Sequence, residues 1–443
     1  MSPVRVIHAS YVNVPATAAL PLEPIKLTAM EAIWVIMPVL QHVLLYEGAD
    51  MPPFEDILQA LRSSLAVTLG SFAPLAGKLV HLKDTGDVAI SCSASDSVKF
   101  VVAESDADVR RLARDEEHDL PVLEQLVPDV DMSKLPAAVL AVQATRFNGG
   151  VAVGVTVHHA VADGRSLWTF VEAWATACRG ETPALTPSFD RSLVKLPRGE
   201  EEEARRIFHE WAPNLPLVTT PPLFLEDRPR FTRRTFTLDM PDIQRLKQHI
   251  VHLGEAHDAP LTGPPSTFVT VTALAWTCFA RCKPFPLNDD LLLFFLADVR
   301  GRLDPPVDRG YVGVCLTRCL VMLPARELRG PRALLTAAAA VQDEIRRMNR
   351  DPANQQSHLT PIMLASWDRL MNVSGSSAFA AYDIADFGWG TPRRTEPIRM
   401  NHDGQLALMR GRDGLGVQVS VSLLQQAQMD EFKSLFLELV HSN

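Results

Sequence analysis

The sequence predicts an α/β protein with two domains. The chain has 443 residues, about twice the length at which a single hydrophobic core stops growing. Segments with strand and helix patterns alternate in both halves, as they do in α/β domains. A stretch rich in proline and acidic residues at 184–222 separates the halves. We therefore expect an N-terminal domain over 1–190, a crossover linker over 191–225 and a C-terminal domain over 226–443.

Three segments of the first half have the clearest patterns. Residues 54–69 place leucine and isoleucine side chains on one face of a helix. Residues 151–157 are rich in β-branched side chains, which is typical of a buried strand. A tight turn at Asp163 and Gly164 leads into residues 165–178, whose apolar side chains recur at helical spacing. This part of the chain is therefore predicted to form a strand, a turn and a helix in succession.

The second half continues the alternation of helices and strands. Three segments have apolar residues at helical spacing, one is a short apolar strand, and two apolar runs flank a glycine-rich turn. These are the expected helices at 269–282, 333–348 and 432–440, the strand at 291–297, and the hairpin of 406–409 with 417–421. The α/β pattern thus extends through the chain.

Charge and composition exclude several classes of protein. The 43 basic and 52 acidic residues give a net charge of −9, which argues against a broad phosphate-binding face and against nucleic acid as a partner. No apolar run approaches the roughly 20 residues of a membrane-spanning helix. The N-terminus lacks the apolar core of a signal peptide. We therefore expect a cytoplasmic protein without a membrane partner.

Cysteine usage indicates neither a disulfide scaffold nor a metal site. Six cysteines in a chain of 443 residues are too sparse for such a scaffold. Cys278 with Cys282 and Cys315 with Cys319 have CxxxC spacing, but neither pair has a histidine at a spacing typical of zinc sites. We interpret these cysteines as small core residues and expect no bound metal.

The strongest local candidate for chemistry follows the strand predicted at 151–157. His158 and His159 come directly after the strand, and Asp163 comes four residues after His159. Histidine accepts protons near neutral pH and is the commonest general base. A carboxylate at this spacing suits an ion pair with a distant arginine that would fix the turn. In isolation, the HxxxD spacing also fits a histidine that packs in the core.

A second and rarer string lies far downstream, where residues 386–390 read DFGWG. With the histidine motif upstream, this string resembles the plant BAHD family of CoA-dependent acyltransferases. Residues 71–79, SFAPLAGKL, are similar to that family's F-x-PLAG-[RK]-L segment. Residues 298–306, DVRGRLDPP, are similar to its D-x-R-x-R-L-x-PP segment. The resemblance covers nearly the whole chain.

The resemblance implies both a fold and a reaction. The fold would be two similar-sized α/β domains of mixed sheet and helices, like chloramphenicol acetyltransferase, with the active site in a channel at the domain interface. His159, rather than His158, would deprotonate an acceptor hydroxyl or amine, which then attacks the thioester of an acyl-CoA directly. Acyl-CoA would be a co-substrate, and no permanently bound cofactor or covalent acyl-enzyme would be required. A small-molecule acceptor is the other expected partner, and we expect a monomer.

The other site residues are assigned by the same resemblance. Ser374 is the candidate donor to the tetrahedral oxyanion, in a stretch that lacks the tryptophan often found in the family. The residues expected to contact acyl-CoA are Arg165, Arg302, Ser266 and Thr267.

Two structural roles are also expected. Asp163 should point away from His159 and pair with a basic residue of the second half, Arg300. The DFGWG loop should be structural and lie away from the reacting centre.

Within the family, the pattern favours the anthocyanin and flavonoid glycoside acyltransferases, many of which use malonyl-CoA. Arg165 directly follows the HxxxDG string, and residues 311–315, YVGVC, resemble that group's YFGNC string. We therefore expect malonyl transfer to a hydroxyl of a phenolic or flavonoid glycoside. The alternatives are a hydroxycinnamoyl-CoA O- or N-acyltransferase and a catalytically silent homologue that acts as a binding protein.

Overall fold

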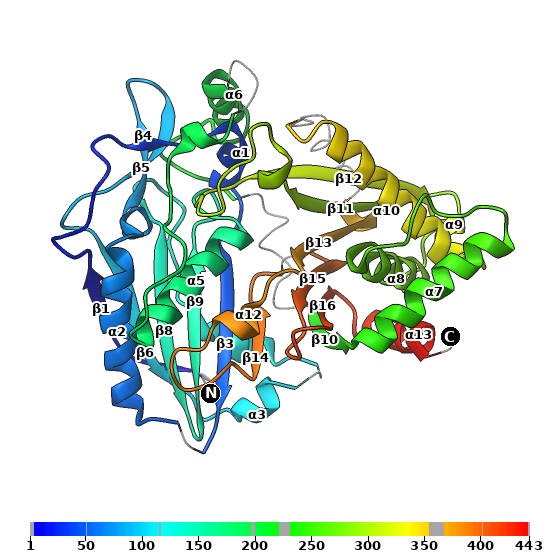
Figure 1. Ribbon diagram of the computed structural model, residues 1–443, viewed down its shortest axis with the longest axis horizontal. Coiled ribbons are helices and arrows are strands. Elements are labelled where there is room, and N and C mark those ends of the chain that lie inside the picture. The colour runs from blue at the N-terminus through cyan, green and yellow to red at the C-terminus, as the bar shows by residue number, and fades with distance from the viewer. Residues whose placement is uncertain are drawn as a thin grey trace.

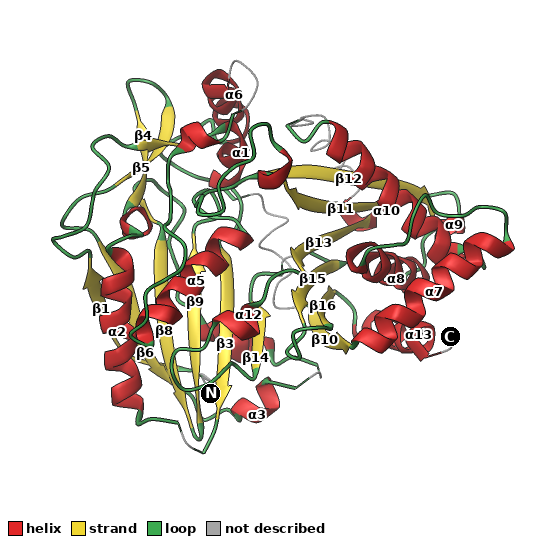
Figure 2. Cartoon of the chain, viewed as in Figure 1, coloured by secondary structure: helices red, strands yellow, loops and turns green. Residues whose placement is uncertain are grey.

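Two six-stranded sheets, one in each lobe, organise the structure (Figures 1 and 2). The computed structural model describes residues 4–49, 51–114, 117–195, 200–220, 231–353, 367–400 and 402–441. In spatial order, the first sheet contains β1 (Arg5–Asn13), β6 (Ser97–Glu104), β8 (Leu140–Phe147), β9 (Gly150–Val157), β3 (Leu40–Glu47) and β14 (Arg394–Pro397). The second contains β10 (Thr232–Leu238), β16 (Val417–Leu423), β15 (Gln405–Arg410), β13 (Leu370–Ser376), β11 (Asp290–Asp298) and β12 (Leu316–Pro324).

Both large sheets mix parallel and antiparallel pairs. In the first sheet β6 and β8 are parallel, whereas β3 and β9 are antiparallel. In the second sheet β13 is parallel to both of its neighbours, and β15 and β16 form the predicted antiparallel hairpin. A small four-stranded sheet in the first lobe contains β2 (Ile25–Lys26), β5 (Asp87–Ser91), β4 (Lys78–Leu82) and β7 (Ala137–Ala138). The structure thus confirms the expected α/β fold with mixed sheets.

The helices flank the sheets in both lobes, as Figure 2 shows. Those that precede the second lobe are α1 (Ala29–Ala32), η1 (Ile33–Val35), α2 (Phe54–Leu69), η2 (Ala73–Ala76), α3 (Val109–Leu112), α4 (Leu120–Leu123), η3 (Glu124–Leu126), α5 (Gly164–Cys178), η4 (Arg191–Leu193) and α6 (Glu200–Trp211). Those that follow are α7 (Met240–Ala256), α8 (Thr267–Cys282), η7 (Arg300–Arg302), α9 (Ala325–Arg329), α10 (Ala333–Arg350), η8 (Trp367–Arg369), α12 (Ala381–Ile384) and α13 (Gln426–His441).

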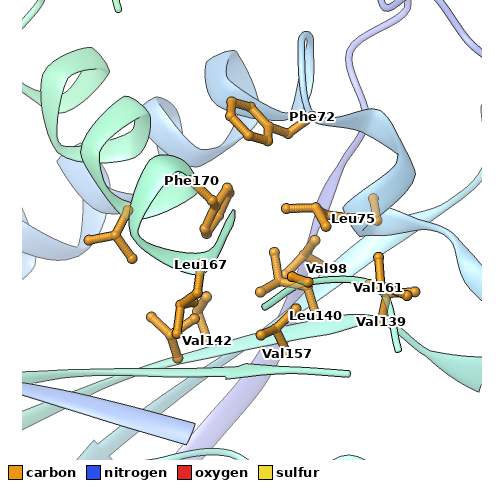
Figure 3. Close-up of a cluster of buried hydrophobic side chains, with 14 of the residues drawn as sticks. Phe72, Leu75, Val98, Val139, Leu140, Val142, Val157, Val161, Leu167 and Phe170 are labelled. Atoms are coloured by element: carbon orange, nitrogen blue, oxygen red, sulfur yellow. The ribbon is translucent and has the colours of Figure 1, made fainter. Parts of the chain in front are cut away.

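The first core holds the chain around the histidine motif. Helices α2 and α5 pack side by side on one face of the first sheet. Figure 3 shows Leu167 and Phe170 of α5 close to Val142 and Val157 of the sheet, with Phe72 above them. All five side chains are buried. Burying each large apolar side chain contributes about 1.5–3 kcal/mol, so the end of β9 and the start of α5 are held firmly.

The second core surrounds α8. This helix is buried along almost its whole length and packs against α7, α10 and α13. Its sequence is apolar on every side, which is the pattern of a helix enclosed within a domain. The second lobe therefore has a core of its own.

Two segments depart from a simple division of the chain at the linker. Strand β14 belongs to the C-terminal half in sequence, yet it pairs with β3 at the edge of the first sheet. Within the expected linker, α6 buries Ala204 and Phe208 in the first core, and Arg205 forms an ion pair with Asp87 at 2.7 Å. Glu201 and Glu202 of its acidic start are exposed. The domain boundaries stay a prediction.

Among the described residues, no helix combines the length and the apolar character needed to cross a membrane. All six cysteines are free thiols.

Candidate active site

The histidine motif connects the end of β9 to the start of α5 (Figure 1). The backbone N–H of His158 donates to the carbonyl of Val139 at 2.8 Å, so the chain leaves the sheet in a fixed direction. The backbone N–H of Val161 donates to the carbonyl of His158 at 2.9 Å, which closes the turn. The side chains of His158 and His159 are both buried. The motif is therefore part of the first core rather than an exposed loop.

The two adjacent histidines have different surroundings. His158 is 1% exposed, and its Nδ1 accepts a hydrogen bond from the backbone N–H of Ala160 at 3.2 Å. His159 is 9% exposed, and its buried Nδ1 has no hydrogen-bond partner of normal geometry among the described residues. His158 is thus tied to its own turn, whereas the ring of His159 is the one that reaches the edge of the core.

Burial keeps both imidazoles neutral near pH 7. It lowers the pKa of His158 to about 3 and that of His159 to about 4. For His159, the carbonyl of its own residue and the carboxylate of Asp163 act in the opposite direction, but burial outweighs them. A neutral imidazole has a free lone pair that accepts a proton, which is the state that a general base requires.

Asp163 holds the turn and faces the second lobe. Its Oδ1 accepts the backbone N–H of Ser166 at 2.9 Å and thereby caps the N-terminus of α5. Its Oδ2 accepts a hydrogen bond from Nη1 of Arg300 at 2.7 Å. The two side chains are 1% and 2% exposed. The structure confirms the expected ion pair between Asp163 and Arg300, and it places no hydrogen bond between Asp163 and the ring of His159.

The segment around Gly313 joins the second lobe to the same turn. The Gly313 carbonyl accepts hydrogen bonds from Oγ of Ser166 at 2.8 Å and from Nη2 of Arg300 at 3.0 Å. The backbone N–H of Cys315 donates to Oδ2 of Asp163 at 3.1 Å. Because these groups are buried, they are costly to separate. The turn after the two histidines is therefore fixed to the second lobe.

Trp34 contacts the histidine motif, and the motifs identified neither it nor Glu31. The indole of Trp34 stacks on the ring of His159, with centroids 3.8 Å apart and planes at 21°. Glu31 lies one turn earlier, is fully buried, and pairs with Arg191 at 2.8 Å. It also accepts the backbone N–H of Val314 at 3.3 Å. The spacing of Thr28 and Glu31 is that of a capping box, which was the available signal for a helix start here.

Arg165 lies at the start of α5 and forms an ion pair with Asp298 of the second lobe. Its side chain is 40% exposed, and its Nη1 donates to Oδ2 of Asp298 at 3.2 Å. Asp298 also accepts a hydrogen bond from Nη1 of Arg300 at 3.2 Å. The two arginines therefore share one carboxylate, and the remaining donors of Arg165 make no hydrogen bond within the described ranges.

Ser374 lies in β13, and its hydroxyl is hydrogen-bonded to the neighbouring strand. Its Oγ donates to the carbonyl of Leu406 on the neighbouring strand at 3.1 Å. A hydroxyl has one proton to donate, so an oxyanion role would require this bond to break. The chain that follows β13 does reach the turn after the two histidines, because a Cβ on Gly164 would lie 3.0 Å from the ring of Phe379.

Ser266, Thr267 and Arg302, which are also expected to contact acyl-CoA, belong to segments that touch α10 at different points. Ser266 caps the N-terminus of α8 by accepting the backbone N–H of Val269 at 3.2 Å, and Thr267 begins that helix. The chain just before them bonds to Gln342 of α10. Arg302, which is exposed, donates from Nε to Oδ1 of Asn349 at 2.7 Å. Gln342 and Asn349 are two turns apart on that helix, about 10 Å.

The DFGWG loop packs into the first core. The buried ring of Phe387 meets Trp174 edge to face at 5.0 Å, and Trp389 stacks on Phe387 at 5.6 Å. Oδ1 of Asp386 accepts the backbone N–H groups of two loop glycines. Trp174 lies eleven residues after Asp163 along α5, about 16 Å away. The side chains of this loop therefore contribute to the packing of the first core.

Comparisons with known proteins identify the family of this chain. The model of the Transferase family matches residues 6–439. Phenolic glucoside malonyltransferase 2 of Arabidopsis thaliana is 29% identical, over 95% of each chain. The chain is also similar to two other proteins of Arabidopsis thaliana. It is 30% identical to malonyl-CoA:anthocyanidin 5-O-glucoside-6''-O-malonyltransferase over 98% of each chain. It is 27% identical to agmatine coumaroyltransferase over 99% of each chain.

A solved structure shows the same fold. The crystal structure of vinorine synthase superposes with a TM-score of 0.74 at 20% identity, covering 99% of both chains. The family match spans almost the entire sequence and includes both motifs and both lobes. This chain therefore belongs to the Transferase family, the BAHD acyltransferases that its motifs resemble, and is an acyl-CoA-dependent acyltransferase.

Proposed function

We propose that this enzyme transfers a malonyl group from malonyl-CoA to a hydroxyl of a phenolic or flavonoid glycoside, with His159 as general base. The assignment of His159 as the base rests on its surroundings. Its ring is neutral and lies at the edge of the core, and Asp163 forms its ion pair with Arg300. The donor and acceptor classes are supported by the relatives named as malonyltransferases of phenolic glucosides and anthocyanidin glucosides.

The reaction needs one proton acceptor and no covalent intermediate. Nδ1 of His159 is buried, so Nε2 is the nitrogen that we assign to the acceptor hydroxyl. As the hydroxyl proton moves to Nε2, the acceptor oxygen attacks the thioester carbonyl and an ester bond forms. The carbon–sulfur bond then breaks, and the CoA sulfur takes the proton from the imidazolium. His159 is thereby returned to its neutral state.

Replacement of the two histidines tests the assignment of the base. His159→Ala should lower kcat by about 10²–10⁴-fold, because that is the usual contribution of general-base assistance. His158→Ala is the matched control, since it removes a buried imidazole from the same turn, and it should change kcat far less once folding is verified by circular dichroism. Equal losses of kcat in two folded variants would remove His159 as the base.

Arg165 is the residue that we propose for recognition of the malonyl carboxylate. Its guanidinium is partly exposed beside the catalytic turn, and only Nη1 is used by Asp298. A charge-assisted hydrogen bond to a carboxylate contributes about 1.5–3 kcal/mol, or about 10- to 100-fold in relative efficiency.

Donor competition tests this proposal. Arg165→Ala should lower kcat/KM for malonyl-CoA by about 10- to 100-fold and leave the value for acetyl-CoA nearly unchanged. Arg165→Lys should restore part of the loss, because it keeps the charge without the planar fork. Similar losses with both donors would assign Arg165 to the turn instead.

For the CoA end of the donor we propose Ser266, Thr267 and Arg302. Ser266 and Thr267 lie at the N-terminus of a long helix, and Arg302 presents an exposed guanidinium, and both kinds of group suit phosphates. Ser374 is left outside the proposed machinery because its proton is bonded to the Leu406 carbonyl.

A second candidate is a hydroxycinnamoyl-CoA O- or N-acyltransferase, favoured by the similarity to agmatine coumaroyltransferase. A matrix of donors against acceptors, with product masses read directly, separates the two. Malonylated glycosides would support the first proposal, and coumaroyl esters or amides would support the second. Absence of CoA thiol release with every donor would instead indicate a silent homologue that acts as a binding protein.

A further inference from the structure

The ring of His159 is not oriented by a carboxylate. In a His–Asp arrangement, the carboxylate bonds Nδ1, sets the tautomer and stabilises the imidazolium. Here Asp163 is bonded to Arg300, Ser166 and Cys315. Nδ1 of His159 has no hydrogen-bond partner of normal geometry in the described part of the chain. Burial lowers the pKa of the ring, the backbone of His159 and of Ala162 acts to raise it, and no carboxylate of the described residues is hydrogen-bonded to the ring. A contact on the face of the ring would add to these.

Trp34 is the group in contact with the face of that ring. The centroids are 3.8 Å apart and the planes differ by 21°, so the two rings lie nearly parallel in van der Waals contact. The contact follows from the topology. Leu40, at the start of β3, pairs with Val157, at the end of β9, so the chain before β3 and the chain after β9 emerge at the same end of the sheet.

The segment that carries Trp34 is itself anchored on two sides. Glu31 accepts the backbone N–H of Thr28 at 2.8 Å and closes the short helix that leads to Trp34. The same carboxylate pairs with Arg191 and accepts the backbone N–H of Val314 from the second lobe. The indole is thus held in place independently of His159.

We propose that Trp34 is a positioning residue for the general base, which fixes the plane of the His159 ring and stabilises the imidazolium that forms during proton transfer. The proposal rests on the proposed role of His159. An indole face is electron-rich and attracts a cation placed over it, and tryptophan does so more strongly than phenylalanine. The attraction is greater for the charged ring than for the neutral one, so it lowers the barrier rather than strengthening substrate binding.

Graded fluorination of Trp34 tests the electronic part without changing its shape. Site-specific incorporation of 5-fluorotryptophan and of 4,5,6,7-tetrafluorotryptophan withdraws electron density from the ring face in steps. The single-turnover rate should fall with each step, by about 3- to 30-fold in total, because desolvated cation–π contacts have that magnitude. The KM for acyl-CoA and the Tm should stay within error. Tetrafluorotryptophan at Trp276, which is fully buried in the second core, is the matched control and should leave the rate unchanged.

Ordinary substitutions provide the second arm. Trp34→Phe should retain more of the single-turnover rate than Trp34→Leu, because only phenylalanine keeps an aromatic face over the imidazole. An unchanged rate across the fluorinated series, or an equal loss from fluorination at Trp34 and Trp276, would overturn the proposal. If His159→Ala were active, the proposed base itself would fail; if it were inactive while fluorination had no effect, only the role of Trp34 would be refuted.

Discussion

Removal of the Asp163 carboxylate should damage stability more than any ordinary helix-cap mutation. Asp163 has two functions in the structure, because one oxygen caps α5 and the other binds Arg300. Burial acts to raise the pKa of Asp163, but the charge of Arg300 outweighs it, and the net pKa lies below the usual value. The carboxylate is therefore ionised at neutral pH, and Arg300 depends on it for charge compensation.

The expected cost follows from the two contacts. Removing one partner of a buried ion pair costs about 3–5 kcal/mol, and removing an N-cap costs about 1 kcal/mol. Arg300 would keep Asp298, but that carboxylate is 3.2 Å away and its side chain is 32% exposed. Asp163→Ala should therefore destabilise the first lobe by about 4–6 kcal/mol, which corresponds to a fall in Tm on the order of 10 °C.

The assay is thermal denaturation followed by tryptophan fluorescence, with kcat measured in parallel. Asp239→Ala is the matched control, because Asp239 caps α7 by accepting the backbone N–H of Asp242 at 2.8 Å and is exposed. Asp239→Ala should lower the free energy of unfolding only by the contribution of the helix cap, about 1 kcal/mol. Asp163→Asn should fall between the two, since asparagine keeps a good cap but loses the charge.

Two results would refute this reasoning. One is a change in Tm for Asp163→Ala no larger than that for Asp239→Ala, which would mean that the buried pair contributes nothing. The other is additive losses in Asp163→Ala combined with Arg300→Met. Because the second substitution removes the stranded charge, the double variant should be no less stable than Asp163→Ala alone.

Three further predictions concern the loop, the serine and pH. Trp389→Ala should lower the Tm by removing a partly buried ring at a cost of about 3 kcal/mol, while the KM for acyl-CoA stays unchanged; a large rise in KM with an unchanged Tm would place the loop in the binding site. Ser374→Ala should lower kcat by less than about 10-fold, because its hydroxyl is bonded to Leu406, whereas an oxyanion donor would cost about 10²–10³-fold. Stability should fall between pH 6.5 and pH 4, because burial lowers the pKa of His42, His159 and His402 to about 4 and that of His158 to about 3. The unfolded chain binds protons first in that range, which costs up to about 1.4 kcal/mol per pH unit for each histidine, and equal urea midpoints at pH 7 and pH 5 would contradict this.

The sequence alone determined the elements with strong local periodicity. The helices expected at 54–69 and 165–178 are observed as Phe54–Leu69 and Gly164–Cys178, and the strand expected at 151–157 is observed as Gly150–Val157. In each case the spacing of apolar side chains matches the period of the element, so the local pattern and the final packing agree. The family was also accessible, because its motifs are strings of residues that are contiguous in the chain, and the pairing of Asp163 with Arg300 followed from the resemblance to that family.

Helix α6 shows where a local pattern was hidden by composition. Its acidic and basic residues pair along the outer face, with Glu203 to Arg206 at 2.7 Å. The inward face consists of Ala204, Phe208 and their neighbours at helical spacing. The high charge of the segment therefore masked a narrow apolar stripe, which is enough for a helix that packs on one side.

Other features were decided only by the tertiary structure. The pairing of β14 with β3, the contact of Trp34 with His159 and the bond from Ser374 to Leu406 all join residues from separate segments. Such contacts depend on the register of strands and on which ends of the sheet face one another, and neither is encoded in a local period. The sequence by itself could therefore single out His159 as the candidate base, but only the folded chain shows that an indole from a segment before β3, rather than the nearby carboxylate, lies against its ring.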